Sequence, residues 1–155
     1  MSVPDFSDLE DQIVTLLKAG VAGFNDQVFA ATDVKTDAMK LAAQPPSCLV
    51  YFSGMGPIPA GEKDAIGSPL KRKKTVTFST VTVGKSLRSS AGDRPAVGMH
   101  PLATLMIAAL LGKRLTGTTR PLDIGVYKPL GEDEKRGLVS WEMTWDTMVL
   151  VEQTP

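Results

Sequence analysis

Apolar residues recur along this chain at two spacings, one typical of helices and one typical of strands. From Ser7 to Ala19 they fall three and four positions apart, which predicts an amphipathic helix. Asp5 or Ser7 can cap its start, and Gly20 can end it. A second apolar stripe predicts another helix from His100 to Leu115. Each helix therefore needs a surface against which to bury its apolar side.

The strand signals differ in the number of faces they bury. The compact apolar run Ser47–Ser53 predicts a central strand buried on both faces. Residues 139–152 alternate between apolar and polar, which predicts a long strand with one buried and one solvent face. Residues 74–83 predict a third strand, whose apolar positions change parity. This change indicates either a bulge near Ser79 and Thr80 or burial of opposite faces at the two ends.

Shorter signals and breakers fill the remaining chain. Gly and Pro interrupt residues 54–68, which predicts a long irregular loop between two strong strands. An extended arm at residues 54–74 is one interpretation, and an ordinary surface loop is the other. The weaker elements are short strands at 27–31 and 122–127, a short helix at 36–43 and a charged turn at 131–137.

Together these elements predict an α+β fold. The one-sided last strand is typical of a mixed, largely antiparallel sheet with helices packed on one face. A long hairpin or loop would project from this body. A chain of 155 residues with 43% apolar residues suits a single domain over residues 1–155.

Charge is segregated along the chain although the formal net charge is zero. Residues 1–60 carry seven acidic and three basic groups, residues 61–120 carry three and eleven, and residues 121–155 carry seven and three. Opposite-signed surfaces would follow if the fold keeps these parts separate, which favours docking between complementary partners. The alternative is that folding mixes the charges on one surface.

Few residues have the chemistry of a catalytic, metal or cofactor site. Cys48 and His100 are each the only residue of their type, so a disulfide within the chain and most metal sites are excluded. Gly84, Lys85 and Ser86 resemble the end of a phosphate-binding loop, but Ser79 stands where that motif needs glycine. We expect no catalytic residues, no metal and no cofactor.

For three further features, a structural role is preferred over a functional one. Trp141 and Trp145 share the apolar side of the last strand, which predicts core positions or a face partly covered by a second subunit. Cys48 is expected to be a small core residue, and His100 to be structural. The acidic start and the lack of an apolar run of about 20 residues indicate neither a signal peptide nor a membrane span.

A basic run is the sharpest charged feature. Such a run usually protects a solvated strand edge, but it can also dock on an acidic protein surface or on nucleic acid phosphates. We expect it to contact a neighbouring subunit or a tail partner. The candidate contact residues are Lys71, Arg72, Lys73, Lys74, Arg88 and Arg94.

The order of these segments resembles the small tail terminator proteins of Mu-like phages. The segments that carry the resemblance are PDFSDLEDQIVTLLKAG, SCLVYFSG, TVTFSTVTVGKS, LLGKRLTG, PLDIG and SWEMTWDTMVLVE. It covers most of the chain through diffuse patterns, and the length and basicity of residues 54–74 depart from it.

The resemblance implies a non-enzymatic virion protein assembled in the host cytoplasm. Its subunits would form a hexameric ring at the head-proximal end of a contractile tail, stop growth of the tube and sheath, and dock the neck or connector. Genomic DNA would pass through the lumen without sequence-specific contacts. The alternatives are another neck or tail-completion protein, or a nucleic-acid-binding module that uses the basic residues 71–94.

Overall fold

The computed structural model describes residues 5–30, 46–58, 71–85, 99–133 and 137–152. Five strands form one sheet in the order β1-β2-β3-β5-β4. β1 and β2 are parallel, and all other neighbours are antiparallel. The strands are β1 (Val28–Ala30), β2 (Ser47–Gly56), β3 (Lys71–Lys85), β4 (Asp123–Asp133) and β5 (Leu138–Glu152). The predicted α+β class with a mixed, largely antiparallel sheet is confirmed.

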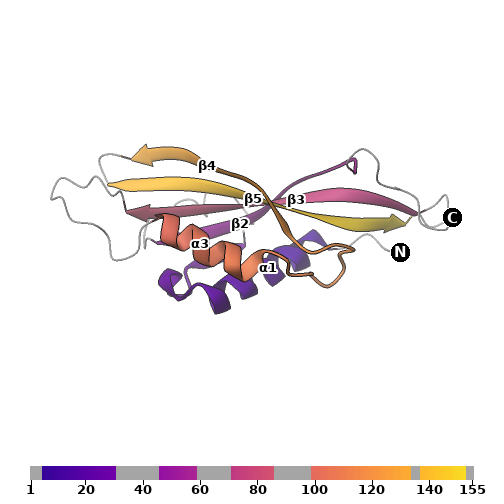
Figure 1. Cartoon of the computed structure of the whole chain (residues 1–155), viewed down its shortest axis with the longest axis horizontal. Helices are drawn as coiled ribbons and strands as arrows, with labels where there is room; N and C mark the ends of the chain where they lie inside the picture. The colour runs from indigo at the N-terminus through magenta and orange to yellow at the C-terminus, as the bar shows by residue number, and fades with distance from the viewer. Residues whose placement is uncertain (1–4, 31–45, 59–70, 86–98, 134–136, 153–155) are drawn as a thin grey trace.

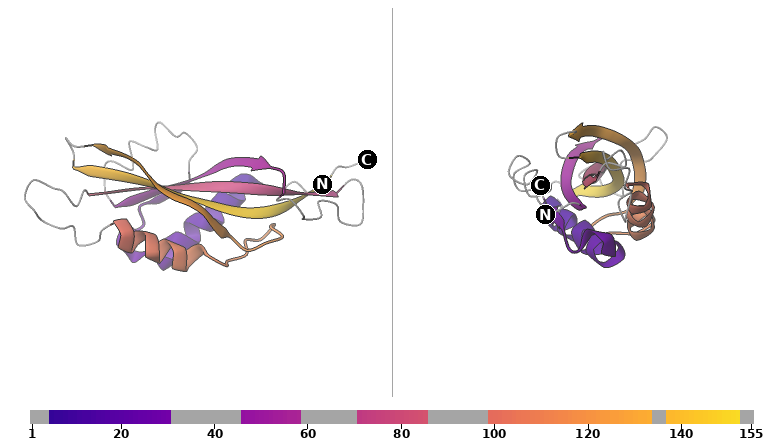
Figure 2. Two further views of the ribbon diagram at one scale, coloured as in Figure 1. Left: turned by 45° about the horizontal axis from the view of Figure 1, so that its top comes forward. Right: turned by 90° about the vertical axis from the view of Figure 1, so that its left-hand side faces the viewer.

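Two helices, α1 (Phe6–Gly20) and α3 (Met99–Leu110), pack on the same face of the sheet (Figure 1). A short 3-10 helix, η1 (Ala22–Phe24), follows α1. Viewed end-on, the sheet curls and the two helices lie across its open side (Figure 2). This arrangement confirms that the helices are segregated on one face, as the one-sided last strand predicts.

The ends of α1 follow from its sequence. The Asp5 side chain accepts a hydrogen bond from the Ser7 backbone amide at 2.9 Å, so Asp5 is the N-cap. At the other end, the Val21 amide donates to the Leu17 carbonyl at 2.9 Å. Helix α1 therefore includes Gly20, one residue beyond the predicted end.

Helix α3 ends five residues earlier than predicted, at Leu110. Gly112 has a φ of 77°, a left-handed conformation that glycine adopts easily and that stops a helix. The Gly112 amide then donates to the Leu122 carbonyl at 3.0 Å, and the Leu122 amide donates to the Lys113 carbonyl at 2.8 Å. The prediction of a helix to Leu115 was wrong because the chain turns here toward β4.

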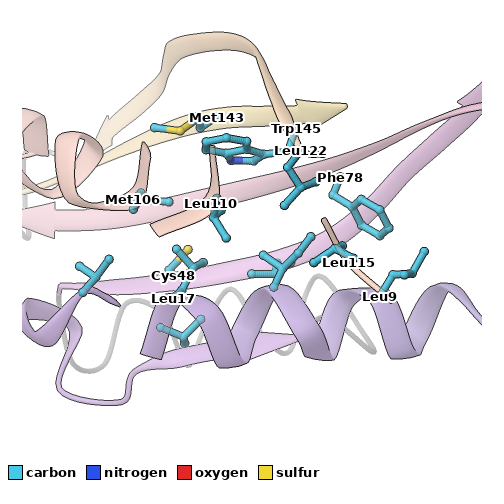
Figure 3. Close-up of a cluster of buried hydrophobic side chains, with 14 of the residues drawn as sticks. Leu9, Leu17, Cys48, Phe78, Met106, Leu110, Leu115, Leu122, Met143 and Trp145 are labelled. Carbon is cyan, nitrogen blue, oxygen red and sulfur yellow. The ribbon is translucent and has the colours of Figure 1, made fainter. Parts of the chain in front are cut away.

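One hydrophobic core lies between the helices and the sheet (Figure 3). Helix α1 contributes residues at three- and four-residue spacing, and the facing strands contribute alternate residues. Trp145 and Cys48 are fully buried, which confirms both as core positions. The largest fully buried side chains are Trp145, Phe24, Phe78, Leu9, Ile13, Leu17, Leu49, Leu102, Met106, Leu110 and Leu122.

Helix α1 also covers β2 where that strand becomes irregular. The register of β2 with β3 shifts between Phe52 and Gly54. Phe6 stacks on Phe52 with ring centroids 4.4 Å apart, and the Glu10 carboxylate makes a hydrogen bond with the Phe52 backbone. Glu10 is only 9% exposed, and this burial raises the pKa of its carboxyl. A buried carboxylate thus ties the helix to β2 at its bulge.

The parity change in β3 is neither a bulge in that strand nor a change of buried face, because the same row of residues stays buried along its length. Val76 and Phe78 face the helices, and Thr80 and Thr82 continue that buried row. The hydroxyl of Thr80 donates to the Met143 carbonyl at 3.0 Å, which explains how a polar group is buried there. The predicted bulge near Ser79 and Thr80 is absent from β3, because the irregularity lies in β2.

Several strands run longer than predicted. β4 continues through Gly131 to Asp133, so the first three residues of the predicted charged turn at 131–137 are strand, and 134–136 lie outside the described residues. β2 reaches Gly56 and β3 begins at Lys71, so both ends of the predicted 54–74 arm are regular strand. β2 and β3 pair antiparallel, but the central part of the arm and the predicted helix at 36–43 lie outside the described residues, so the projecting hairpin or loop stays a prediction.

Candidate functional site

The basic run lies on a two-stranded extension of the sheet. Pairing of β2 with β3 ends at Gly56 and Thr75. Residues 71–74 of β3 continue beyond this point and pair with residues 149–152 of β5. These two segments, which we call the basic ribbon, extend past both helices at the right of Figure 1. A two-stranded ribbon has little stability by itself, so its base in the larger sheet supports it.

Side chains of the basic ribbon point to both faces of the sheet. Lys74 lies opposite Val149, on the face that carries the helices, and Lys73 lies opposite Leu150, on the other face. Both lysines are half-buried. Within the described ranges, neither makes a hydrogen bond or an ion pair. Two positive charges therefore lack a compensating partner in that part of the chain.

The other predicted contact residues are not all comparable with these lysines. Arg72 is half-buried on the helix-bearing face, and it does interact with another residue. The side chain of Lys71, and Arg88 and Arg94 as a whole, lie outside what the structure describes. The structure thus places Arg72, Lys73 and Lys74 together on one strand, and the contact role of the whole predicted set stays a prediction.

Two carboxylates face each other on the sheet face without helices. Asp123 of β4 lies directly opposite Asp146 of β5. Thr77 donates to Asp146 Oδ1 at 2.7 Å, and the Ile124 amide donates to Asp123 Oδ1 at 2.9 Å. Neither carboxylate makes an ion pair with a described residue. Like charges in directly opposed positions are unfavourable in a sheet.

A third carboxylate on that face is already compensated. Glu142 receives a hydrogen bond from the Tyr51 hydroxyl at 3.1 Å, and Lys128 Nζ lies 3.7 Å from Glu142 Oε1. Hydrogen bonding and a nearby cation both favour the charged form of a carboxylate. Asp123 and Asp146 therefore differ from Glu142 in lacking a cation partner among the described residues, although all three lie on adjacent strands.

An aromatic cluster lies where the start of α3 meets the sheet. His100 Nδ1 and the Tyr127 hydroxyl are 3.1 Å apart, and burial raises the pKa of Tyr127. The His100 ring also meets Trp141 edge-on, with centroids 5.3 Å apart. Tyr127 and Trp141 are half-buried while His100 is exposed. His100 thus contacts Tyr127 and Trp141, which suits the expected structural role. The Trp141 side chain stays partly exposed.

An open cleft of about 430 Å³ separates α1 from the chain that follows α3. Asp8 and Asp11 line one wall, and Lys113 and Arg114 line the other. Gln12 bridges the floor, since its carbonyl accepts from the Thr116 amide at 2.8 Å and its amide group donates to the Thr116 carbonyl at 3.1 Å. The charges of this cleft are mixed and already face one another.

The two helices differ in their outward faces. Helix α1 exposes Asp8, Asp11 and Lys18. Helix α3 carries no charged residue from 99 to 111, and Leu105 and Leu111 are 43% and 46% exposed. Apart from His100 and Thr104 its exposed residues are apolar, whereas an amphipathic surface helix carries charged and polar residues on that side. The outer side of α3 is thus an exposed apolar surface, the kind that commonly marks an interaction site.

The described residues offer little for bond-making chemistry. Cys48 is fully buried, and this burial raises the pKa of its thiol to about 12, so the reactive thiolate is suppressed. Within the ranges given above, no three His, Cys, Asp or Glu side chains gather as metal ligands would. Neither helix there combines the length and apolar character needed to cross a membrane.

Sequence reasoning missed the opposed carboxylates and the aromatic cluster. Asp123 and Asp146 are 23 positions apart, and their meeting depends on the register of β4. That register shifts twice, between Ile124 and Tyr127 and between Pro129 and Gly131. The cluster of His100, Tyr127 and Trp141 likewise depends on where α3 docks. Only the half-buried side chain of Trp141 has a sequence signal, namely its apolar parity in β5.

Similarity to known proteins is found in the fold and not in the sequence. No family model matches the sequence, and no curated protein matches it. Among solved structures, the fold is similar to that of a chain from a structure described as "Virion of native gene transfer agent (GTA) particle", with a TM-score of 0.52 and 13% sequence identity. The alignment covers 91% of this chain and 92% of that chain. This likeness establishes a shared fold along almost the full length of both chains.

Proposed function

We propose that the chain is a structural protein of a phage-like virion, and specifically a tail terminator. The observation that carries the proposal is the fold shared with a chain of a gene transfer agent virion over nine-tenths of both molecules. The likeness of its sequence segments to Mu-like tail terminators supports the finer role. The chain would form a ring at the head-proximal end of the tail and present a docking surface to the neck or connector.

The proposed mechanism is differential docking. The terminator ring binds the last ring of the tail tube more tightly than a further tube ring binds the terminator, so growth of tube and sheath stops when it arrives. A closed ring of identical subunits needs two different, complementary surfaces on each copy. Such a function requires no reacting group, which agrees with the buried thiol of Cys48 and the solitary His100.

The apolar outer side of α3 supports a role in an assembly. Exposed apolar surface is costly to leave in water, at about 25 cal/mol per Å². Leu105 lies on the solvent side of α3 and the exposed Leu111 directly follows the helix, so burial in the monomer does not account for them. In the ring, the neighbouring copy would cover this surface.

Particles assembled without this chain would test the proposal. We expect tails of variable or excessive length that fail to join heads, because nothing would stop polymerisation. Supplying the wild-type chain in trans is the control, and it should restore a single tail length. The measurement is the distribution of tail lengths by negative-stain electron microscopy. Uniform tails joined to heads in the absence of the chain would contradict the proposal.

A nucleic-acid-binding role for residues 71–94 has less support. Strand β3 directs Arg72 and Lys74 to one face and Lys73 to the other, so the described part of the basic run does not form one continuous stripe. Steeply salt-dependent binding of the purified chain to duplex DNA would favour this second function.

A further inference from the structure

We propose that the cleft between α1 and the chain after α3 binds residues 62–66 of a second copy of this chain. These residues, which we call the arm segment, belong to the sequence between β2 and β3. The inference rests on the proposed ring assembly and names a contact that would hold neighbouring copies together. One copy supplies the cleft, and the next copy supplies the arm segment.

Hydrogen bonds between and along its two walls hold the cleft in shape. Gln12 joins α1 to the chain after α3, because its side chain both accepts from and donates to the Thr116 backbone. Arg114 Nε donates to the Thr118 carbonyl at 3.1 Å, which fixes the position of that side chain. The volume of about 430 Å³ lies in the range of pockets that bind small ligands, so it can also take several side chains.

The two walls carry opposite charges, which restricts what can bind. Asp8 and Asp11 form the acidic wall, and their spacing of three residues puts them on one side of α1. Lys113 and Arg114 form the basic wall. A simple ion of either sign, or a nucleic acid phosphate, would be attracted by one wall and repelled by the other. A bound segment must therefore present acidic groups to one side and a basic group to the other.

The arm segment, with the sequence EKDAI, has this distribution of charge. Successive side chains of an extended chain point to opposite sides. Glu62 and Asp64 would therefore face the basic wall while Lys63 faces the acidic wall. Ile66 falls in the same row as Glu62 and Asp64, and Leu115 adds an apolar residue to the cleft directly after the basic wall. Charge and apolar character thus match in one arrangement.

The arm segment of one copy cannot bind in this way to its own cleft. Phe6 at the start of α1 stacks on Phe52, which pairs with Phe78. Lys71 lies seven residues along β3 from Phe78, or about 23 Å at the usual rise of a strand. The five residue steps from Lys71 to Ile66 span at most about 18 Å. Ile66 therefore cannot return even to the start of α1.

The cleft lies still further from the base of the arm segment. Helix α1 leads through η1 to β1, which pairs with residues 48–50 at the end of β2 opposite Gly56. The helix thus runs away from the basic ribbon, and the cleft follows it. The ribbon itself extends past both helices, where a neighbouring copy can approach (Figure 1). Because arm segment and cleft are different surfaces, the contact is head-to-tail and can close a ring.

Zero-length cross-linking of the wild-type chain tests the contact directly. A carbodiimide joins lysine amines to carboxylates that are in direct contact. We expect links from Lys113 to Glu62 or Asp64, and from Lys63 to the acidic wall. In a mixture of isotopically light and heavy chains, these links should join two different copies. Lys18, an exposed residue of α1 that does not line the cleft, is the control and should form no link to the arm segment.

Charge reversal in the full chain tests whether the contact contributes to assembly. One variant carries Glu62→Lys and Asp64→Lys, and another carries Lys113→Glu and Arg114→Glu. In low salt we expect each variant alone to self-associate about tenfold or more weakly than the wild type, because like charges would meet in the cleft. An equimolar mixture should recover association, because every arm segment then finds a cleft of the right charge. Sedimentation velocity over a concentration series measures both effects.

Exchanging two neighbouring residues tests the order of the charges. A variant with Lys63→Asp and Asp64→Lys keeps the composition and net charge, but it directs a basic group to the basic wall and an acidic group to the acidic wall. It should associate more weakly than the wild type. Lys18→Glu changes the net charge outside the cleft and should associate like the wild type. Circular dichroism and thermal melting establish that every variant folds.

Several results would overturn the inference. They are a monomeric wild type throughout the concentration series in low salt, links that are missing or confined to single copies, no recovery in the mixture, and wild-type association of the exchanged variant. Rings that persist in the reversed variants would remove this contact and leave the terminator function intact. Normal tails in particles that lack the chain would instead remove the function, whatever the cross-links show.

Discussion

Helices α1 and α3 both cover the sheet, but their solvent-facing sides differ in polarity. Both pack on one face of the sheet, and both bury leucines against the same core. Outside, α1 is charged and α3 is not. Leu105 stands exposed on α3 where α1 presents Asp8, Asp11 and Lys18.

The difference shows which side of each helix is needed for folding. The inner stripe of each helix is sufficient to dock it on the sheet, as the amphipathic α1 demonstrates. The apolar outer side of α3 adds nothing to the packing of the monomer, so its explanation lies outside the monomer. Surfaces of this type are enriched at protein contacts.

The largest expected effect comes from truncating the inner stripes. Ile13→Ala on α1 and Leu110→Ala on α3 should each lower the free energy of unfolding by about 2–5 kcal/mol, because both side chains are fully buried and leave a cavity. Urea denaturation followed by circular dichroism measures the loss.

The exposed Leu105 of α3 is the matched control for that comparison. Leu105→Ala should change stability by about 0.5 kcal/mol or less, as is usual for a surface site. A loss as large as that of Leu110→Ala would show that the outer side of α3 contributes to the monomer, and the contrast drawn between the helices would be wrong.

A smaller effect is expected where the two helices touch. A Cβ atom at Gly20 of α1 would lie 2.6 Å from the Cβ of Ala109 on α3. Gly20→Ala should therefore cost about 1–3 kcal/mol from overpacking, reduced by the better helix propensity of alanine. Thermal unfolding measures the change.

A second substitution shows whether this cost arises from the contact. Ala109→Gly should be less damaging in the Gly20→Ala background than in the wild type, with a coupling energy of about 1 kcal/mol. Ala108→Gly removes a neighbouring exposed methyl group and should cost the same in both backgrounds. Strict additivity of Gly20→Ala and Ala109→Gly would contradict the close approach.

The smallest effect concerns the carboxylate by which α1 holds β2. Burial raises the pKa of Glu10, so the folded chain binds its proton more tightly than the unfolded chain. Stability from this group is fully present below its ordinary value of 4.5 and is lost as the pH rises through the raised pKa. Glu10→Gln keeps an acceptor for the Phe52 backbone and removes the charge.

We expect Glu10→Gln to flatten the pH dependence of stability above pH 4.5, with a change of about 1 kcal/mol or less at neutral pH. Asp26→Asn, which changes an exposed carboxylate outside α1, is the control and should leave that slope unaltered. Urea midpoints measured from pH 4 to pH 8 decide the matter. A slope in Glu10→Gln equal to that of the wild type would contradict the role given to this carboxylate.

Periodicity predicted the elements whose signals are local. The alternation in β5 and the stripe and cap of α1 depend on neighbouring residues only, and both predictions were confirmed. The end of α3 was wrong because the left-handed Gly112 and the pairing of Leu122 with Lys113 depend on where the chain goes next. Long-range backbone pairing overrode a continuing apolar stripe.

The candidate site was predictable in part for the same reason. Charge counting along the chain found the basic run, because its members are adjacent in sequence. The opposed carboxylates Asp123 and Asp146 are separated along the chain, and two register shifts in β4 decide their pairing. No periodic signal encodes the position of a bulge, so only the folded sheet brings Asp123 and Asp146 together.

Because Cys48 is buried in the core, the reactivity of its thiol reports how often the fold opens. Its thiol is the only one in the sequence, it lies on β2 beneath the helices, and Thr82 donates a hydrogen bond to its sulfur at 3.8 Å. A labelling reagent can reach it only when helix and sheet separate. The rate of thiol modification therefore reads out how often the body of each subunit opens, in free chains and in assembled particles alike, without any engineered probe.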